Sequence, residues 1–337
     1  MNYRILGNTG LKVSELCLGT MTFGGKGYFK VIGQLQQEPV DELVKLSIDA
    51  GINFIDTANV YSEGLSEELT GKAIRNLGLK RDDLVIATKV RGKMSDKPND
   101  IGLTRKHILQ QAEESLKRLN IDYIDLYQIH GYDPLTPFEE TLAALDSLVQ
   151  SGKVRYIGCS NLAAWQLMKA LGISSSQHIS KFVSLQAYYT IAGRDLEREL
   201  APLLKDQKLG LMVWSPLAGG LLSGKYNRTT NPEGARRASF DFPPVNKDKA
   251  FDILDVMHPM AQEKGISVAQ LSLAWLLHQP VVTSVIIGAT KTEQLNDNLK
   301  SIDVKLSKEE LDKLDAASQL IPEYPGWMLQ RQGVDRV

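Results

Sequence analysis

The hydrophobic residues of the chain fall into short apolar runs that alternate with amphipathic segments. Eight runs have the composition of β-strands, namely residues 15–19, 53–56, 84–88, 124–129, 154–159, 182–186, 211–214 and 284–287. Segments with helical spacing lie between them, among them residues 39–50, 67–77, 104–119 and 137–150. Because continuous apolar runs are typical of strands covered on both faces, we expect parallel strands buried beneath helices.

The first residues have a different pattern. Residues 3–6 and 11–13 are short strand-like segments on either side of Gly-Asn-Thr-Gly. Two such segments around a glycine-rich turn predict a β-hairpin that precedes the first strand of the main sheet.

Repeated strand and helix units suit either a closed barrel or an open, doubly wound sheet. Polar or small residues stand at the ends of nearly all the apolar runs: Asp56, Lys89, His130, Ser160 with Asn161, Gln186, Trp214 with Ser215, and Gly288. An open sheet would place ligands at two or three strand ends, whereas in a barrel all carboxyl ends meet at one opening. The sequence therefore predicts an α/β fold, a (β/α)8 TIM barrel with an N-terminal β-hairpin. Nothing reads as a linker, so residues 1–337 are expected to form a single barrel domain.

Composition narrows the classes of partner. The formal net charge is -1 and no Lys/Arg run exceeds a pair, so the basic surface of a nucleic-acid binder is not expected. No apolar stretch approaches the roughly 20 residues that span a bilayer, and the amino terminus lacks the pattern of a signal peptide. We expect a cytoplasmic protein with a small-molecule partner and no membrane association. The oligomeric state is left open.

Cysteine and histidine give no sign of a metal site. Cys17 and Cys159 each lie inside an apolar run, which is typical of reduced thiols in the core. The histidines stand far apart in the sequence, at positions 107, 130, 178, 258 and 278. No pair has metal-ligand spacing, so no metal is expected.

Three of the strand-end residues suggest acid–base chemistry. Asp56 ends one apolar run, Tyr61 follows five positions later, and Lys89 ends the next run. An ammonium group at the end of a buried strand must be paired, because removing an isolated charge from water is costly. Asp56 is the candidate partner of Lys89. A lysine beside a phenol would lower the phenol's pKa from about 10, which would make Tyr61 a usable acid near neutral pH.

The sequence as a whole resembles a known family. Over nearly its whole length it is similar to the aldo-keto reductase superfamily, most specifically through Gly-Ile-Asn-Phe-Ile-Asp-Thr-Ala-Asn-Val-Tyr at residues 51–61. The other matching segments are residues 4–14, 86–89, 126–130, 153–161, 214–220 and 287–291. The resemblance implies a barrel that binds NADP(H) without a Rossmann domain. It also implies a catalytic tetrad of Asp56, Tyr61, Lys89 and His130.

The resemblance further implies the reaction, a reversible reduction of aldehydes or ketones to alcohols by hydride from nicotinamide C4. Tyr61 would supply the proton and Lys89 would depress its pKa. Asp56 would hold Lys89, and His130 would hydrogen-bond the carbonyl oxygen or relay a proton during oxidation. The substrate would be a small carbonyl compound or alcohol.

The resemblance also implies a set of cofactor contacts. Ser160, Asn161 and Gln186 would bind the carboxamide, and the flat indole of Trp214 would stack on the nicotinamide ring. Thr20 and Met21 would touch the ribose or the substrate, and Asp56 would also lie near the cofactor. The remaining contacts, chiefly with phosphate groups, would come from Ser215, Pro216, Leu217, Lys225, Arg237, Gly288, Thr290, Lys291, Gln294 and Asn298. Lys225 and Arg237 would contact the 2′-phosphate of NADPH, and basic residues at these positions favour NADPH over NADH.

Other protein classes fit the sequence less well. A short-chain dehydrogenase would need Tyr-x-x-x-Lys and a Gly-x-Gly-x-x-Gly after the first strand, and neither pattern occurs. Potassium channel β subunits resemble the chain at residues 214–218 and 223–226, which keeps an NADP(H)-binding regulatory or redox-sensing subunit as the alternative. Those proteins typically lack the tetrad histidine, so His130 favours turnover. The sequence does not identify the substrate. Five aromatic residues could form an apolar pocket and are equally plausible as core or surface residues: Phe23, Tyr28, Phe29, Tyr188 and Trp327.

Overall fold

Eight parallel strands form a closed barrel in the computed structural model, which describes residues 1–228, 237 and 240–334. Their order around the barrel is β10-β3-β4-β5-β6-β7-β8-β9. The strands are β3 (Leu16–Gly19), β4 (Phe54–Asp56), β5 (Val85–Val90), β6 (Ile124–Ile129), β7 (Val154–Ser160), β8 (Phe182–Tyr188), β9 (Gly210–Trp214) and β10 (Val282–Ile287). Because β10 pairs with both β3 and β9, the sheet has no edge. The predicted barrel is confirmed, and an open sheet is excluded.

Strand boundaries show where the sequence pattern fell short. β6 has the predicted bounds, but β5 continues through Lys89 to Val90 and β8 continues past Gln186 to Tyr188. The predicted runs ended at Thr88 and at Gln186. In the barrel, Lys89 and Gln186 remain in the sheet as buried residues and pair with polar groups of other strands.

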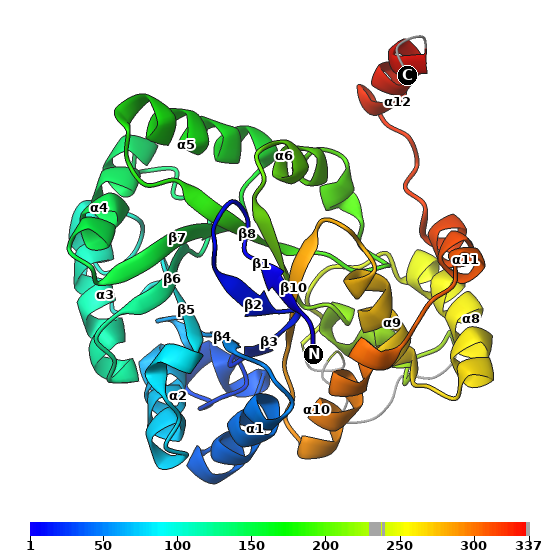
Figure 1. Cartoon of the computed structure of the whole chain (residues 1–337), viewed down its shortest axis with the longest axis horizontal. Helices are drawn as coiled ribbons and strands as arrows, with labels where there is room; N and C mark the ends of the chain where they lie inside the picture. Colours follow the sequence, from blue (N-terminus) through cyan, green and yellow to red (C-terminus); the bar gives the residue numbers. More distant parts are fainter. Residues whose placement is uncertain (229–236, 238–239, 335–337) are drawn as a thin grey trace.

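The N-terminal hairpin covers one end of the barrel (Figure 1). It consists of β1 (Tyr3–Ile5) and β2 (Lys12–Ser14), paired antiparallel as predicted. Leu6 and Val13 pack with Cys17 and Met212 in a cluster of buried apolar residues. Arg4 fixes the hairpin by donating to the carbonyl oxygen of Val282 at 2.6 Å. The hairpin therefore closes the amino-terminal end of the barrel and leaves the carboxyl ends of the strands for the site.

Helices surround the barrel and bury its outer face (Figure 1). They are α1 (Gln37–Asp49), α2 (Leu65–Asn76), α3 (Arg105–Leu119), α4 (Phe138–Gln150), α5 (Ala164–Gln177), α6 (Leu200–Asp206), α8 (Lys247–Lys264), α9 (Val268–Leu277), α10 (Thr292–Leu299) and α11 (Lys308–Ser318). A last helix, α12 (Gly326–Gly333), lies away from the barrel and has no buried residue (Figure 1). Short 3-10 helices occur at η1 (Gly27–Val31), η2 (Tyr61–Gly64), η3 (Arg81–Asp83), η4 (Asp195–Glu197), η5 (Ala218–Ser223) and η6 (Lys300–Asp303).

Three global features bear on function. Cys17 and Cys159 are buried and unpaired. Across the residues given above, no helix combines the length and apolar character needed to cross a bilayer. Within the same residues, no three His, Cys, Asp or Glu side chains are grouped in a way that could hold a metal ion.

Candidate active site

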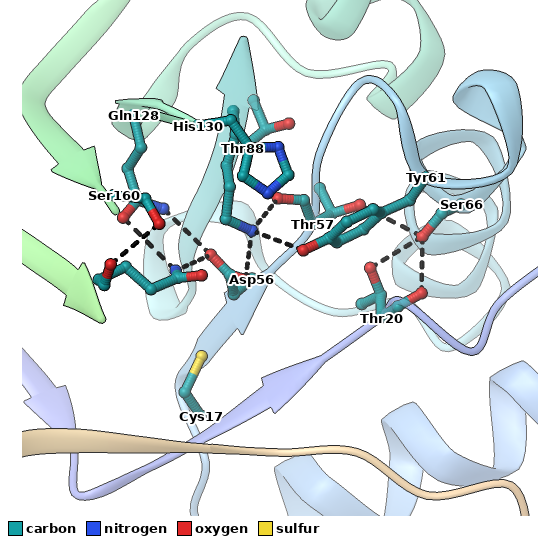
Figure 2. Close-up of polar contacts among 12 residues, drawn as sticks. Cys17, Thr20, Asp56, Thr57, Tyr61, Ser66, Thr88, Gln128, His130 and Ser160 are labelled. Atoms are coloured by element: carbon teal, nitrogen blue, oxygen red, sulfur yellow. Dashed lines mark hydrogen bonds and ion pairs between the residues drawn. The ribbon is translucent and has the colours of Figure 1, made fainter. Parts of the chain in front are cut away.

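Three of the predicted catalytic side chains meet at the carboxyl ends of β4 and β5 (Figure 2). Lys89 is fully buried, and its Nζ lies 2.5 Å from Asp56 Oδ2. The same nitrogen donates to the carbonyl oxygen of Thr57 at 2.8 Å and lies 3.2 Å from Tyr61 Oη. The ammonium group therefore has three oxygen partners, which is what a buried cation requires.

The second oxygen of Asp56 is also occupied. Asp56 Oδ1 accepts from Gln128 Nε2 at 3.1 Å and from Gln186 Nε2 at 2.9 Å. These amides come from β6 and β8, so the carboxylate is fixed from across the barrel interior. Sequence reasoning missed Gln128. Its signal was an amide inside an apolar strand, two residues before His130.

The charge of Lys89 is retained by its partners. Burial alone would lower the pKa of this ammonium group, but Asp56 and Tyr61 act in the opposite direction and raise its pKa above the ordinary value. Lys89 is therefore a cation over the whole physiological range. This agrees with the predicted Asp56–Lys89 pair.

The predicted acidity of Tyr61 is wrong in its net direction. Burial raises the pKa of the Tyr61 phenol, Lys89 lowers it by a smaller amount, and Asp56 adds to the rise. The side chain is only 8% exposed, and the ring of Phe29 packs against it with centroids 5.3 Å apart. Desolvation of the phenolate outweighs the attraction of one ammonium group. Tyr61 is therefore held as a protonated phenol, the form that can donate.

A strained turn positions Tyr61. The next two residues, Ser62 and Glu63, have left-handed backbone angles with φ of 49° and 58°. Ser62 is buried, and its hydroxyl donates to Phe23 O at 3.0 Å and accepts from Gly25 N at 2.8 Å. These two bonds hold the turn in a conformation that residues other than glycine rarely adopt.

His130 completes the predicted tetrad. Its ring lies edge-on to Tyr61 with centroids 5.7 Å apart, and its backbone N–H donates to Val90 O. Burial, Lys89 and Arg91 together lower the pKa of His130 to about 3. The imidazole is therefore neutral at neutral pH and has both a donor and an acceptor nitrogen.

The residues predicted to bind the carboxamide are bonded to one another. Ser160 Oγ donates to Gln186 O at 2.9 Å, and Trp214 Nε1 donates to Asn161 Oδ1 at 3.0 Å. The side-chain amide of Gln186 is bonded to Asp56. The structure thus brings these residues to one place, and their contact with a carboxamide stays a prediction.

The indole of Trp214 belongs to a row of aromatic rings. Phe242 stacks nearly parallel to it at 6.0 Å, and Tyr188 lies at 5.1 Å with tilted planes. Further ring contacts link Phe242 to Phe240, Tyr28 and Phe29, so the row reaches Tyr61. We call Tyr28, Phe29, Phe240 and Phe242 the aromatic wall.

Sequence reasoning named only part of this surface. Tyr28, Phe29 and Tyr188 were among the possible pocket residues and lie along the row, whereas Phe240 and Phe242 were missed because their segment has no regular pattern. Phe23 is fully buried. Trp327 is on α12, where its ring contacts Tyr324.

The predicted phosphate contacts lie around β10 and the start of α10. Gly288, Thr290, Lys291 and Gln294 are exposed there, and Asn298 is buried further along the helix. Thr290 donates through its backbone N–H to Gln294 Oε1 at 3.0 Å. The N-cap residue, Lys291, makes no side-chain capping bond, so the first N–H groups of α10 lack that partner. A free helix amino terminus of this kind favours an anion.

The other predicted contacts follow β9. Ser215 and Leu217 are half-buried, Pro216 is buried, and Lys225 is exposed. Ser215 Oγ accepts from the backbone N–H of Gly219 at 3.0 Å, which fixes the first turn of η5. Lys225 follows η5, two residues after its last residue, Ser223.

Arg237 lies in different surroundings from those expected of a phosphate ligand. It is 7% exposed, and its terminal nitrogens donate to Ala218 O at 2.6 Å and Pro243 O at 2.9 Å. An ion pair with Asp241 at 2.5 Å adds a third protein partner. Arg237 therefore joins η5 to the segment of the aromatic wall, and its contact with a 2′-phosphate stays a prediction.

At the end of β3, Thr20 and Met21 differ in access. Thr20 is buried, and its hydroxyl is 2.8 Å from Ser66 Oγ (Figure 2). Met21 is half-buried. Thr20 is thus positioned to support the strand end, and Met21 is the more accessible of the two.

Comparison with known proteins identifies the family. The model of the aldo/keto reductase family matches residues 15–319. A probable voltage-gated potassium channel subunit beta of Arabidopsis thaliana is 38% identical over 333 residues, 96% of this chain and 99% of the relative. An uncharacterized oxidoreductase of Bacillus subtilis is 40% identical, over 94% of this chain and 95% of its own. Versiconal hemiacetal acetate reductase of Aspergillus parasiticus is 35% identical, over 94% and 96%. The chain therefore belongs to the aldo/keto reductase family.

Proposed function

We propose that this protein is an NADP(H)-dependent oxidoreductase that reduces aldehydes or ketones to alcohols, reversibly, and that residues 1–337 act as one barrel domain. Membership of the family and the reductase and oxidoreductase names of several relatives support an oxidoreductase acting on carbonyl groups. The observation that carries the proposal is the contact of one buried ammonium group, Lys89 Nζ, with both Asp56 and Tyr61.

The proposed chemistry assigns the proton to Tyr61. When bound, reduced nicotinamide would supply the hydride to the carbonyl carbon. The carbonyl oxygen then gains negative charge, and a donor within hydrogen-bond reach stabilises it. Tyr61, protonated because burial raises the pKa of its phenol, transfers its proton to that oxygen. Lys89, 3.2 Å away, stabilises the phenolate that remains.

Asp56 and His130 have supporting roles in this proposal. Asp56 neutralises Lys89 and keeps it directed at Tyr61, since the same nitrogen contacts both side chains. Neutral His130 donates a hydrogen bond to the carbonyl oxygen and thereby orients it. Because the pKa of His130 is lowered to about 3, it is not the source of the proton in reduction.

The proposed cofactor is NADP(H), and the residues present fit it. Amide and hydroxyl groups at Asn161 and Ser160 suit a carboxamide, and the Trp214 indole suits a flat ring. The uncapped start of α10 and the exposed Lys225 suit phosphate groups. A nicotinamide stacked on Trp214 would contact an indole ring that Phe242 also contacts.

The second candidate is a regulatory or redox-sensing subunit that binds NADP(H) with little turnover. It is favoured by the names of relatives in Arabidopsis thaliana and in rice, each a probable potassium channel subunit beta. His130 beside Tyr61 supports turnover.

One experiment separates the two functions. NADPH oxidation is followed by absorbance with a panel of aldehydes and ketones, and NADPH binding is measured in parallel by quenching of tryptophan fluorescence. We expect turnover with wild type, and binding without turnover in Tyr61→Phe. The matched control is Tyr123→Phe. Tyr123 directly precedes β6, at the opposite end of the barrel, and the substitution removes a hydroxyl group that donates to Asp82. Binding by wild type with no oxidation of NADPH would support the subunit function instead.

A further inference from the structure

The proposed mechanism leaves one cation beside the site unused. Arg91 follows β5 directly, and His130 follows β6 directly. Val90 pairs with Ile129, and His130 N–H donates to Val90 O at 2.9 Å. Arg91 and His130 therefore leave the barrel next to each other, and the charge of Arg91 contributes to the low pKa of His130.

The side chain of Arg91 is anchored by its inner nitrogen. Nε donates to the carbonyl oxygen of Tyr132 at 2.8 Å. Arg91 Cδ also lies 3.5 Å from the position that a Cβ on Gly131 would occupy, so the side chain runs along the backbone that follows His130. Arg91 is half-buried, so part of its side chain is exposed to solvent.

The outer nitrogens of Arg91 are free of protein partners. Within the described residues, the hydrogen bond of the Arg91 side chain is the one from Nε, and neither Nη1 nor Nη2 takes part in a hydrogen bond or ion pair. Asp133 feels the charge of Arg91, but its carboxylate accepts from Leu103 N–H, Leu135 N–H and Thr136 Oγ1 instead. By contrast, the terminal nitrogens of the buried Arg237 are both bonded to protein oxygens.

The backbone of Arg91 is strained as well. Its φ of 149° lies in a region that residues with a side chain rarely adopt. The conformation is held by the bond from Gly102 N–H to Arg91 O at 2.9 Å and by the bond from Nε to Tyr132 O. A glycine would fit this backbone with less strain, so the strain points to a role of the arginine side chain itself.

We propose that Arg91 binds a carboxylate group of the substrate, so that the preferred substrates are aldehydes or ketones that also carry a carboxylate. This rests on the proposed function. The planar guanidinium group offers two parallel N–H donors that match the two oxygens of a carboxylate. Anchoring through Nε orients those donors before the substrate arrives.

The position of Arg91 favours the substrate over the cofactor as the source of the anion. The predicted phosphate contacts follow β9 and β10, whereas Arg91 follows β5, which β3 and β4 separate from β10. The catalytic side chains Tyr61 and His130 lie on the same side as Arg91, after β4 and β6. An anion at Arg91 would therefore belong to the molecule whose carbonyl faces Tyr61.

The test compares 4-carboxybenzaldehyde with 4-methylbenzaldehyde, which has a similar shape and no charge. In Arg91→Gln we expect kcat/KM to fall about 10- to 100-fold for the acid and to change by less than about 2-fold for the neutral aldehyde. Arg91→Gly relieves the backbone strain and should show the same selective loss, which guards against misfolding of the first variant. Lys93→Gln is the matched control, because Lys93 is exposed and pairs with Asp96. Its ratio of the two kcat/KM values should equal that of wild type.

A binding measurement keeps this inference separate from the proposed function. Calorimetry of benzoate and of neutral benzamide should show benzoate weakened about 10- to 100-fold in both Arg91 variants, with benzamide unchanged. Suppose that the neutral aldehyde is reduced and that the ratio of kcat/KM for the acid to kcat/KM for the neutral aldehyde is the same in Arg91→Gln as in wild type. That result would overturn the carboxylate site and leave the proposed function standing. If no carbonyl compound is reduced, the proposed function fails. Benzoate binding that depends on Arg91 then supports the anion site, and equal benzoate binding in wild type and Arg91→Gln overturns it.

Discussion

The two sides of the barrel mouth are built in opposite ways. Around β4 and β5, Asp56, Tyr61 and Lys89 are almost fully buried, and the ammonium and carboxylate groups have several partners each. Around β10 and α10, the predicted phosphate contacts Thr290 and Lys291 are exposed, and the helix start is uncapped. The polar groups of the first side are bonded within the protein, whereas the second side has an exposed lysine and helix N–H groups without a side-chain cap.

This difference separates stability from binding. A charge enclosed on the β4–β5 side is compensated only by the neighbouring protein groups, so removing one partner leaves an unpaired buried ion. A charge on the α10 side is already solvated, so removing it changes the affinity for a ligand and little else.

The largest effect is expected at Lys89. Lys89→Met removes the ammonium group and leaves Asp56 buried without a cation, which should destabilise the fold by about 3–5 kcal/mol and abolish turnover. Urea denaturation and NADPH oxidation measure the two losses. On the other side of the mouth, Lys225→Met should leave the denaturation midpoint unchanged while weakening NADPH binding.

A second substitution sharpens this result. Asp56→Asn combined with Lys89→Met removes both charges, so the double variant should regain part of the stability lost in Lys89→Met and none of the turnover. If Lys89→Met proved as stable as wild type, the stability of the fold would not depend on pairing Asp56 with Lys89.

The next effect distinguishes the two predicted 2′-phosphate contacts. Lys225→Gln should weaken NADPH roughly 10-fold and leave NADH affinity unchanged, because its group is exposed and interacts with the ligand alone. Arg237→Gln should weaken both nucleotides and lower stability by about 1–3 kcal/mol, since two carbonyl groups and Asp241 lose a buried donor. Titrations with both nucleotides and a denaturation curve check this. Arg237→Gln that is fully stable and affects NADPH alone would return Arg237 to the role of a phosphate ligand.

The pH dependence of stability should report on His130. Its pKa is about 3 in the folded protein and about 6.5 when unfolded, so at intermediate pH the unfolded state binds a proton that the folded state does not. Stability from this group is therefore present above about pH 6.5 and declines as pH falls towards 3, with a slope of up to about 1.4 kcal/mol per pH unit.

Removing the imidazole tests that slope. His130→Asn should lose less stability on acidification than wild type, as measured by urea denaturation at several pH values between about 4 and 7. His178→Asn, at the exposed end of α5, is the matched control for replacing a histidine. Parallel slopes in wild type and His130→Asn would show that folding does not lower the pKa of His130.

The sequence predicted what depends on chain order and on strong physical costs. Apolar runs and intervening amphipathic segments predicted the barrel, and the cost of burying Lys89 predicted its pairing with Asp56. The sign of the Tyr61 pKa shift could not be predicted in this way. It depends on how deeply Phe29 and the loops bury the phenol, and this burial is set by residues distant in the sequence.

Long-range polar contacts were also beyond the sequence pattern. Gln128 and Gln186 are 58 positions apart, yet both donate to one oxygen of Asp56. Arg237 resembled a phosphate ligand by its local motif, but its role depends on where Ala218 and Pro243 lie in space. A local motif identifies a candidate residue, but it does not predict which protein atoms form hydrogen bonds with that residue's side chain.

An effect no larger than that of Arg237→Gln is expected at Ser62, whose hydroxyl group holds the strained turn after Tyr61. Ser62→Ala loses both hydroxyl bonds, to Phe23 O and from Gly25 N–H, while keeping the strain at φ 49°, so it should destabilise by about 1–3 kcal/mol. Ser62→Gly loses the same bonds but adopts this φ freely, which offsets about 1 kcal/mol of that loss. Both variants should lower kcat more than they raise KM, because the turn positions Tyr61 and does not contact the substrate. Thermal denaturation and steady-state kinetics rank the variants. If Ser62→Gly were the less stable of the two, the hydroxyl bonds and the backbone angle would not be acting as described.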